Sequence, residues 1–511
     1  MATPYGIKFA VHLINNHFGD LVSKVCESLM EKGPLTFDEI ERFVGIKAEK
    51  VRNSLLVLIQ HNCVQAFVQE LPGDLAQDGN INKNVTKYFA VFNHIIHRGR
   101  FEKFLDIVKQ DFDPPCFDLM EGLFQHGRLS LDQLRARFGQ LSKAEDVDST
   151  LENLKKLVTS RYVERCPKPE PSVDPPQDEE PPKKKRGATK SAEVVTSPET
   201  LEQRALIAAA SIDAVRFSIP TCFETFITGE HPGTVMAGEK RKREEAEFKL
   251  DHGGNEEKVV LWRPNFEEFI VRLRVKACIE SVRDWIDDRS VLIFNAMLEG
   301  CKNVDTKMNT KRSVPLSLEA IYEEVIKNQN MTIDHVRDAL GDLCSSFGFI
   351  TMEDESYTID FERIIEVAQT AEVESVVMKR YGVDSLRMFK FLLKTRRLTE
   401  TDKISDTALV EKKDAAKHLY KMWQDGYLHL ERIVAGAQFL LWKVDRFSLW
   451  NHVLNEMFHA ALNLSLRAKH EKEQAQEGMT MENKTKLRKV QLMLYSSLMK
   501  LDNAIMLFHD F

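Results

Sequence analysis

The sequence predicts a mainly α-helical chain with small β-sheets, arranged as four tandem units followed by an antiparallel pair of C-terminal helices. The first observation behind this prediction is a repeat, because EKGPLTFDEIERFVG at residues 31–45 returns as QHGRLSLDQLRARFG at residues 125–139. The second is that each copy is followed by a stretch with helical apolar spacing and then by runs of strand-forming residues. The third is a C-terminal region with two amphipathic stretches joined by a polar segment.

The repeated segment carries the start signals of a short helix. Thr36 and Ser130 stand where an N-cap belongs, and Glu39 and Gln133 follow three residues later. In this capping-box pattern, each of the two side chains accepts a hydrogen bond from the backbone amide of the other residue. Each copy ends in a glycine, which readily takes the left-handed conformation after a helix. The pattern therefore predicts two equivalent helix-turn-helix units.

The residues after each second helix extend this prediction to a winged helix. In the first copy, CVQAFVQ and VTKYFAVF read as strands on either side of a polar, glycine-containing loop within residues 63–92. Helix, turn, helix, strand, loop and strand is the element order of a winged helix. In the second copy, RYVERC at residues 161–166 is the expected first strand. Its expected partner is AVRFSI at residues 214–219, which follows a long insertion.

Two later regions repeat this order. LSLEAIYEEV at residues 316–325 precedes a further amphipathic stretch, and FITM and YTID then flank the four-residue turn EDES as a minimal wing. RRLTETDKI at residues 396–404 precedes a helix in which Ala416, Leu419 and Trp423 are expected to face inward. YLHL and FLLWKV are its expected wing strands. We therefore expect four tandem winged-helix domains.

A charged, proline-rich segment separates the second and third units, and its composition predicts a linker and insertion rather than a packed core. Two basic runs within it are candidate nuclear-import signals, with a linker kept soluble by charge as the alternative. These candidates are Lys183, Lys184, Lys185, Arg186, Lys240, Arg241, Lys242 and Arg243. The predicted boundaries are 1–93, 94–166, 262–365 and 366–445 for the four winged helices, 167–261 for the linker and 446–511 for the helical hairpin.

Composition and motifs exclude several classes of function. The chain has 511 residues and a net charge of −7, so we expect any contact with nucleic acid to be local. No apolar run reaches the roughly 18 residues that span a bilayer, and no secretion signal begins the sequence. Eight scattered cysteines without a C-x-x-C pair indicate free thiols. Phosphate-binding, zinc-protease and hydrolase motifs are absent, so we expect no catalytic residues, cofactor or metal.

The charge of the four second helices distinguishes those that could meet DNA. A winged helix can place its second helix in the major groove, where Lys and Arg hold phosphates and acidic residues are repelled. In the first and fourth units basic residues outnumber acidic ones, and in the second and third units the reverse holds. We therefore expect at least two units to face proteins or to be structural. The candidate DNA contacts are Lys47, Lys50, Arg52, Lys412, Lys413 and Lys417.

Several of these segments resemble one known family, the largest member of the heterotrimer specific to RNA polymerase III. Residues 17–65, from HFGDLVSKVCESL to LIQHNCVQ, resemble its N-terminal module, and RYVERCP resembles the end of its second. WRPNFEEF at residues 262–269 resembles the start of its third module, and ESVVMKRYGVDSLRMFKFLL at residues 374–393 that of its fourth. The C-terminal hairpin lies where the family has its coiled coil. The matches occur in one order along nearly the whole chain.

The resemblance implies a nuclear, non-catalytic subunit of DNA-directed RNA polymerase III with four winged helices and an antiparallel coiled-coil hairpin. It implies partners as well: a smaller winged-helix subunit, an acidic subunit, the clamp of the largest polymerase subunit, a promoter initiation factor and DNA near the transcription bubble. The implied roles are promoter recruitment, DNA opening and initiation of transfer RNA, 5S ribosomal RNA and other small RNA synthesis.

Three other classes of protein remain as alternatives. The first is a free-standing winged-helix regulator that binds DNA by itself, which the acidic balance of the chain disfavours. The second is a cullin-like ubiquitin-ligase scaffold, which would need long N-terminal helical repeats. An enzyme is the third. The chain also looks distantly like the alpha chain of the polymerase II initiation factor E, but it lacks the zinc-ribbon cysteines of that protein.

Overall fold

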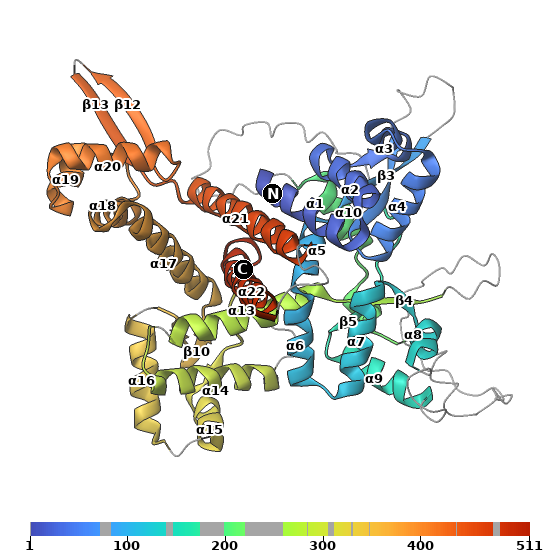
Figure 1. The fold of residues 1–511 in the computed structure, drawn as a ribbon. Coiled ribbons are helices and arrows are strands. Elements are labelled where there is room, and N and C mark those ends of the chain that lie inside the picture. The colour runs from blue at the N-terminus through green and yellow to red at the C-terminus, as the bar shows by residue number, and fades with distance from the viewer. Residues whose placement is uncertain are drawn as a thin grey trace, which may run out of the picture. The chain divides into compact units, whose positions relative to one another are not determined.

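The computed structural model describes residues 2–71, 83–138, 147–173, 199–219, 259–283, 285–304, 311–328, 331–346, 348–435, 437–473 and 481–511. These residues form two compact units. One consists of Leu13–Glu268, and the other of Met1–His12 together with Phe269–Phe511. Each unit contains two small sheets with helices around them (Figure 1).

The first repeat builds a four-stranded sheet in the order β1-β3-β2-β6. The predicted capping box is confirmed, because the Thr36 amide donates to Glu39 Oε2 at 2.8 Å and the Glu39 amide donates to Thr36 Oγ1 at 3.4 Å. Gly45 follows the helix with a left-handed φ of 68°, as predicted. The elements are α2 (Asp20–Lys32), β1 (Leu35–Thr36), α3 (Phe37–Val44), α4 (Ala48–Gln60), β2 (Val64–Leu71), β3 (Lys83–Ala90) and α5 (Phe92–His97).

Two histidines in this region are kept neutral by their surroundings. His94 in α5 lies with Nδ1 2.9 Å from the carbonyl oxygen of Asn62. Burial lowers the pKa of His94 to about 3, and the positive charge of Arg263 adds to the effect. Burial, followed by the charge of Arg98, lowers the pKa of His61 to about 4. Both imidazoles are therefore uncharged at neutral pH.

The second repeat builds a three-stranded sheet in the order β4-β7-β5. Its capping box is also present, because the Ser130 amide donates to Gln133 Oε1 at 3.0 Å and the Gln133 amide donates to Ser130 Oγ at 3.2 Å. Gly139 lies outside the described residues. The elements are α6 (Phe101–Asp111), α7 (Pro114–His126), β4 (Leu129–Ser130), α8 (Leu131–Phe138), α9 (Val147–Thr159), β5 (Val163–Arg165) and β7 (Leu261–Pro264).

The predicted partner strand at residues 214–219 is wrong. The partner of β5 is β7, and residues 213–216 form the short helix α11 (Asp213–Arg216). Trp262 of β7 is fully buried, so the strand contributes a large apolar side chain to the core. Arg216 instead reaches the buried carboxylate of Glu164 and also bonds Glu267 at 2.8 Å. The segment therefore lies against β5 through an ion-pair network and not through a strand ladder.

The described residues of the insertion include secondary structure that its composition did not indicate. β6 (Ser172–Val173) extends the first sheet by pairing in parallel with β2 at Val68 and Gln69. The helix α10 (Leu201–Ala209) begins with a capping box of its own at Thr200. Ala205 of this helix packs on the buried rings of Phe67 and Phe89. The apolar surface that the linker lacks by itself is thus supplied by the sheet it covers.

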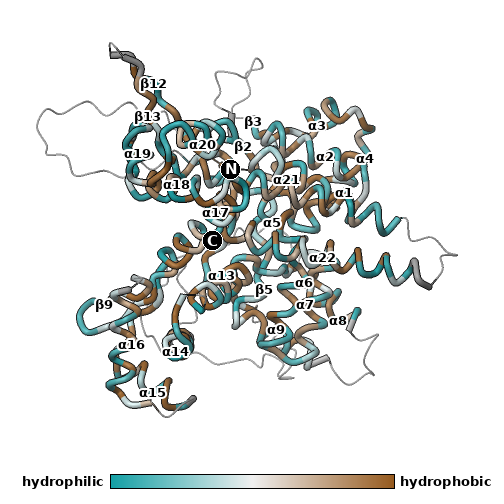
Figure 2. Tube along the Cα trace, turned by 60° about the vertical axis from the view of Figure 1, so that its left-hand side comes forward, coloured by the Kyte–Doolittle hydropathy of each residue, from teal (hydrophilic) through white to brown (hydrophobic). Residues whose placement is uncertain are grey.

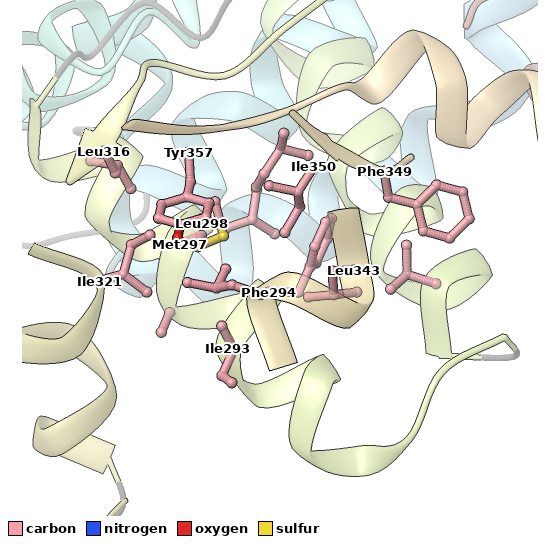
Figure 3. Packing of buried hydrophobic residues seen from close by; sticks show 14 of the residues in the cluster. Ile293, Phe294, Met297, Leu298, Leu316, Ile321, Leu343, Phe349, Ile350 and Tyr357 are labelled. Atoms are coloured by element: carbon pink, nitrogen blue, oxygen red, sulfur yellow. The ribbon is translucent and has the colours of Figure 1, made fainter. Parts of the chain in front are cut away.

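The third sheet has the order β8-β10-β9 and covers a core to which several helices contribute side chains (Figure 3). Phe294 and Met297 of α14 meet Leu343 of α16 and Ile350 of β9, and all four side chains are at most 1% exposed. The elements are α13 (Phe266–Arg283), α14 (Asp288–Val304), β8 (Leu316–Ser317), α15 (Leu318–Asn328), α16 (Ile333–Ser346), β9 (Ile350–Glu353) and β10 (Ser356–Ile359).

The fourth sheet has the order β11-β13-β12, and its long hairpin projects beyond α19 and α20 (Figure 1). Strands β12 and β13 pair from His429↔Lys443 to Ala435↔Ala437. Leu419 is buried, as predicted. The elements are α17 (Phe361–Tyr381), α18 (Val383–Thr395), β11 (Thr399–Glu400), α19 (Thr401–Ala408), α20 (Lys412–Gln424), β12 (His429–Ala435) and β13 (Ala437–Lys443).

Two long helices end the described chain, α21 (Arg446–Glu473) and α22 (Met481–His509), and they lie side by side (Figure 1). The ring of Trp450, near the start of α21, lies 5.9 Å from that of Phe508, near the end of α22, so the helices run antiparallel. On the other side of α21, Glu456 accepts hydrogen bonds from Tyr427 at 2.9 Å and Arg380 at 2.9 Å. This carboxylate joins α21 to the turn between α20 and β12 and to α17.

The first helix, α1 (Pro4–Phe18), also contacts α21, although the two are far apart in sequence. The Tyr5 amide donates to Asn455 Oδ1 at 3.0 Å, and the Tyr5 ring stacks on His459 at 4.1 Å. Further along the same two helices, the rings of Phe9 and Phe458 lie 6.0 Å apart. The first residues of the chain therefore belong to the same compact unit as the C-terminal helices.

Polar and apolar residues alternate along the helices in Figure 2, in keeping with helices that each bury one face. Among the described residues, no helix is long and apolar enough to cross a membrane. The seven cysteines in this part of the chain are free thiols, and five of them are buried.

Candidate nucleic-acid interface

The first group of predicted DNA contacts lies at the start of α4. Lys47 is the N-cap residue, and Lys50 and Arg52 are in the first two turns. All three are exposed, and none makes an ion pair with a described residue. Because successive residues of a helix turn by about 100°, Lys50 and Arg52 point about 160° apart. The structure therefore divides these three cations between opposite sides of the helix.

The outward face of α4 is not a basic surface. Opposite the buried Val51 and Leu58 it presents Glu49 and Leu56, and Leu56 is 59% exposed. Arg52 borders a pocket of about 270 Å³ that is otherwise apolar. The lining residues are Phe37, Arg52, Leu55, Leu56, Ile59 and Tyr88. Such a surface suits a protein partner better than a phosphate backbone.

The second group lies on α20, where the cations gather on one side. Ala415, Leu419 and Met422 form the buried stripe of this helix. Lys413 and Lys417 lie one turn apart on the opposite side, and Tyr420, Lys421 and Gln424 continue the same stripe. All five side chains are exposed. The second helix of the fourth unit thus presents three lysines outward.

Nearby carboxylates affect these lysines unequally. Lys412 Nζ lies 3.1 Å from Asp402 in α19, and Lys417 Nζ lies 3.0 Å from Asp414 one turn earlier. The hydrogen bond from Lys417 lowers the pKa of the Asp414 carboxyl. Lys413 makes no ion pair with any residue that the structure describes. Exposed pairs of this kind are weak, so a phosphate can displace them.

Aromatic side chains border the lysine stripe. Trp423 was expected to face inward, but it is 41% exposed and its ring lies 6.1 Å from that of Tyr420. The prediction was wrong because Ala415 and Met422, and not their neighbours Ala416 and Trp423, complete the buried face. In the wing, the cross-strand pair Ile433↔Phe439 is also exposed, at 45% and 41%.

The predicted contacts left out three members of this surface, Tyr420, Lys421 and Gln424. The helical spacing in the sequence could have found Tyr420 and Lys421, because they follow Lys417 by three and four residues and such residues are neighbours on a helix surface. The acidic second helix of the third unit, α16, keeps Asp338 and Asp342 exposed. Its Arg337 lies 3.5 Å from Asp334. This helix offers no comparable basic stripe.

The remaining candidate sites are the nuclear-import residues and possible metal sites. The eight candidate import residues, within 183–186 and 240–243, lie outside the described residues. In the part of the chain that the structure describes, no group of three or more His, Cys, Asp or Glu side chains could hold a metal ion.

Comparison with known proteins identifies relatives that match along nearly the whole chain. Three family models match: the RNA polymerase III subunit RPC82 helix-turn-helix domain at residues 8–69, RNA polymerase III subunit RPC82 at 152–368, and the C-terminal winged-helix domain of POLR3C at 373–441. The DNA-directed RNA polymerase III subunit RPC3 of Danio rerio is 24% identical over 94% of this chain and 85% of its own length. The proteins of that name from Dictyostelium discoideum and Homo sapiens are 22% and 23% identical. They cover 99% and 95% of this chain and 100% and 86% of their own lengths.

Proposed function

This chain belongs to the family of the RNA polymerase III subunit RPC82, which its relatives carry under the name RPC3, and from that premise we propose that it is a non-catalytic subunit of DNA-directed RNA polymerase III. The support is the order of the three family models along the chain and the near-full-length relatives. A subunit role agrees with a chain built from small sheets and helices whose exposed faces differ in charge.

The proposal extends to the architecture. Four times, a short strand is followed by two helices and then by two further strands in the same sheet, of which the second pairs with the short strand. This recurrence supports four tandem winged-helix domains. The antiparallel packing of α21 and α22 supports a C-terminal coiled-coil hairpin.

The resemblance supplies the finer role. We place this subunit in the nucleus, on the clamp of the largest polymerase subunit, with a smaller winged-helix subunit and an acidic subunit as neighbours. There it contacts the promoter initiation factor and DNA near the transcription bubble, and it aids DNA opening and initiation of small RNA synthesis. The differing faces of α4, α16 and α20 support a division of labour in which only some units meet DNA.

The DNA contact is proposed for α20, and the observation that carries it is the stripe of Lys413, Lys417 and Lys421. Lysines on the outward side of the second helix of a winged helix are placed to bind phosphates. The other two members of the stripe, Tyr420 and Gln424, carry no charge and so do not oppose a phosphate. Lys47, Lys50 and Arg52 are the weaker candidates, because α4 spreads them over opposite sides.

The test is charge reversal of Lys413, Lys417 and Lys421 to Glu in the assembled polymerase. Each lost phosphate contact reduces the slope of log affinity against log salt by about 0.9, so the slope should fall by about 2 to 3. A matched control reverses Lys109, Lys276 and Lys379, three exposed lysines on α6, α13 and α17. An unchanged slope in the α20 variant would remove this helix from the DNA path. Tight, sequence-selective binding by the isolated chain would favour a free-standing regulator instead.

A further inference from the structure

One exposed helix face has no role in the function proposed above. It lies on α22, on the side away from α21. Between Lys484 and Lys500 this helix contains five lysines and arginines and no acidic residue. The buried residues of α22 that pack on the rest of the unit, Ile505 and Met506, come after this stretch.

The outward face of this stretch combines cations with exposed apolar side chains. Leu487, Val490, Leu494 and Leu498 are half-buried and mark the inward side. At about 100° per residue, Arg488, Lys489, Leu492, Met493, Ser496 and Lys500 fall on the other side, and all six are exposed. We call these six residues the outer stripe of α22.

Leu492 and Met493 are unusual members of an exposed face. They are 69% and 70% exposed, among the highest values of any large apolar side chain in the described chain. They stand next to each other, and Arg488, Lys489 and Lys500 lie one to two turns away. A contiguous apolar centre with a charged border is the composition of a protein interface, not of a phosphate-binding surface.

We propose that the outer stripe of α22 is a docking surface for an acidic amphipathic helix of a partner protein. Apolar side chains of the partner pack on Leu492 and Met493, as a third helix packs on a helical pair. Its carboxylates face Arg488, Lys489 and Lys500, none of which makes an ion pair with a described residue. Charge complementarity selects an acidic partner and repels basic ones. This inference goes beyond the polymerase assignment and does not depend on it.

The test uses the full chain and a synthetic helical peptide of about 21 residues, with Leu at two positions per heptad and Glu at most others. Binding is followed by fluorescence anisotropy of the labelled peptide. Two variants remove the two halves of the surface: Arg488→Glu with Lys489→Glu, and Leu492→Ser with Met493→Ser. Because these side chains are exposed, circular dichroism and thermal melting should be unchanged. The matched control, Lys379→Glu with Lys394→Glu, makes the same change of net charge at exposed lysines of α17 and α18.

The expected result is that the charge reversal weakens peptide binding at least tenfold and the serine variant at least fivefold, while the control stays within twofold of the parent chain. A peptide with Lys in place of Glu should not bind. Absence of binding by the parent chain, or equal binding by all variants, would overturn the proposal. So would a serine variant that binds normally while the charge reversal abolishes binding of a short DNA duplex or of phosphatidylserine vesicles. The surface would then serve nucleic acid or lipid headgroups.

Discussion

Gly127 lies where the first and second repeats meet, and its replacement by alanine gives a sharp test of the packing there. Its φ is +78°, and an added Cβ would collide with the backbone carbonyl of Gln60 at the end of α4. Two hydrogen bonds join Gln60 to the residues on either side of Gly127. The Arg128 amide donates to the Gln60 carbonyl at 3.0 Å, and Gln60 Nε2 donates to the His126 carbonyl at 3.0 Å.

The equivalent residue of the first repeat is the natural control. Gly33 has a φ of +80°, but a Cβ there would meet nothing nearer than 3.8 Å. Both alanine variants adopt a backbone conformation that costs about 1–3 kcal/mol. Only Gly127→Ala must also push the Gln60 carbonyl away, which weakens two hydrogen bonds of about 1 kcal/mol each. The free energy of unfolding should therefore fall by about 2 kcal/mol more in Gly127→Ala than in Gly33→Ala.

Thermal melting of the purified chain provides the assay. For a folded unit of this size, about 2 kcal/mol corresponds to a Tm about 4–8 °C lower in Gly127→Ala than in Gly33→Ala. Equal melting temperatures in the two variants would refute the reasoning. They would mean that the Gln60 carbonyl at the end of α4 can move aside without lowering the free energy of unfolding.

Three other changes have defined outcomes. The pKa of His94 is lowered to about 3, so the unfolded chain binds a proton at this imidazole more readily than the folded chain does. The stability that depends on the neutral imidazole is therefore fully present above about pH 6.5 and is lost as the pH falls toward 3. His94→Gln should flatten that loss in urea titrations between about pH 7 and pH 5, and an unchanged slope would contradict it. Glu456→Gln removes the charge that joins α21 to Tyr427 and to Arg380 of α17 and should lower the Tm by a few degrees, whereas the neighbouring exposed Asn451→Gln should not. Arg216→Met leaves Glu164 with one cation and should make the chain cleavable by chymotrypsin after Phe217 at a lower protease concentration; a parent-like digest would show that the ion pairs do not hold this segment.

Local signals in the sequence predicted the local structure well. Thr36 and Ser130 form the expected capping boxes, because a capping box needs only residues three positions apart. The third wing was also found, although its turn is tighter than expected. It consists of Asp354 and Glu355 alone, and both take a positive φ, which suits a two-residue hairpin turn.

Long-range pairing was harder to predict. The strand β7 joins β5 after a long insertion, and no local rule distinguishes LWRP from AVRFSI as its partner. Charge does not decide between them, because Arg216 and Arg263 both pair with Glu164, and the choice depends on long-range packing such as the burial of Trp262. The ordering of α10 depends likewise on Phe67 and Phe89, which belong to another part of the chain.

The candidate site was predicted in part. Charge counting found the basic helices, because net charge is a sum over residues that the sequence shows directly. Charge counting could not show that the cations of α20 share one side of the helix while those of α4 do not. The side on which a residue lies depends on which residues the core buries. Leu419 is common to both faces, but Ala415 and Met422 in place of Ala416 and Trp423 turn the buried face of α20 by roughly 65° and bring Trp423 to the surface.

The contact between α1 and α21 bears on how the protein is made. Tyr5 and its partner Asn455 are 450 residues apart in the chain. At translation rates of about 5–20 residues per second, α1 leaves the ribosome between roughly 20 and 90 s before the surface that covers it exists. During that interval Phe9 and Tyr5 have no native partner on α21, so their rings stay open to solvent or to other proteins at the first helix. Synthesis that stops before α21 leaves the same helix exposed permanently, and such products should be degraded.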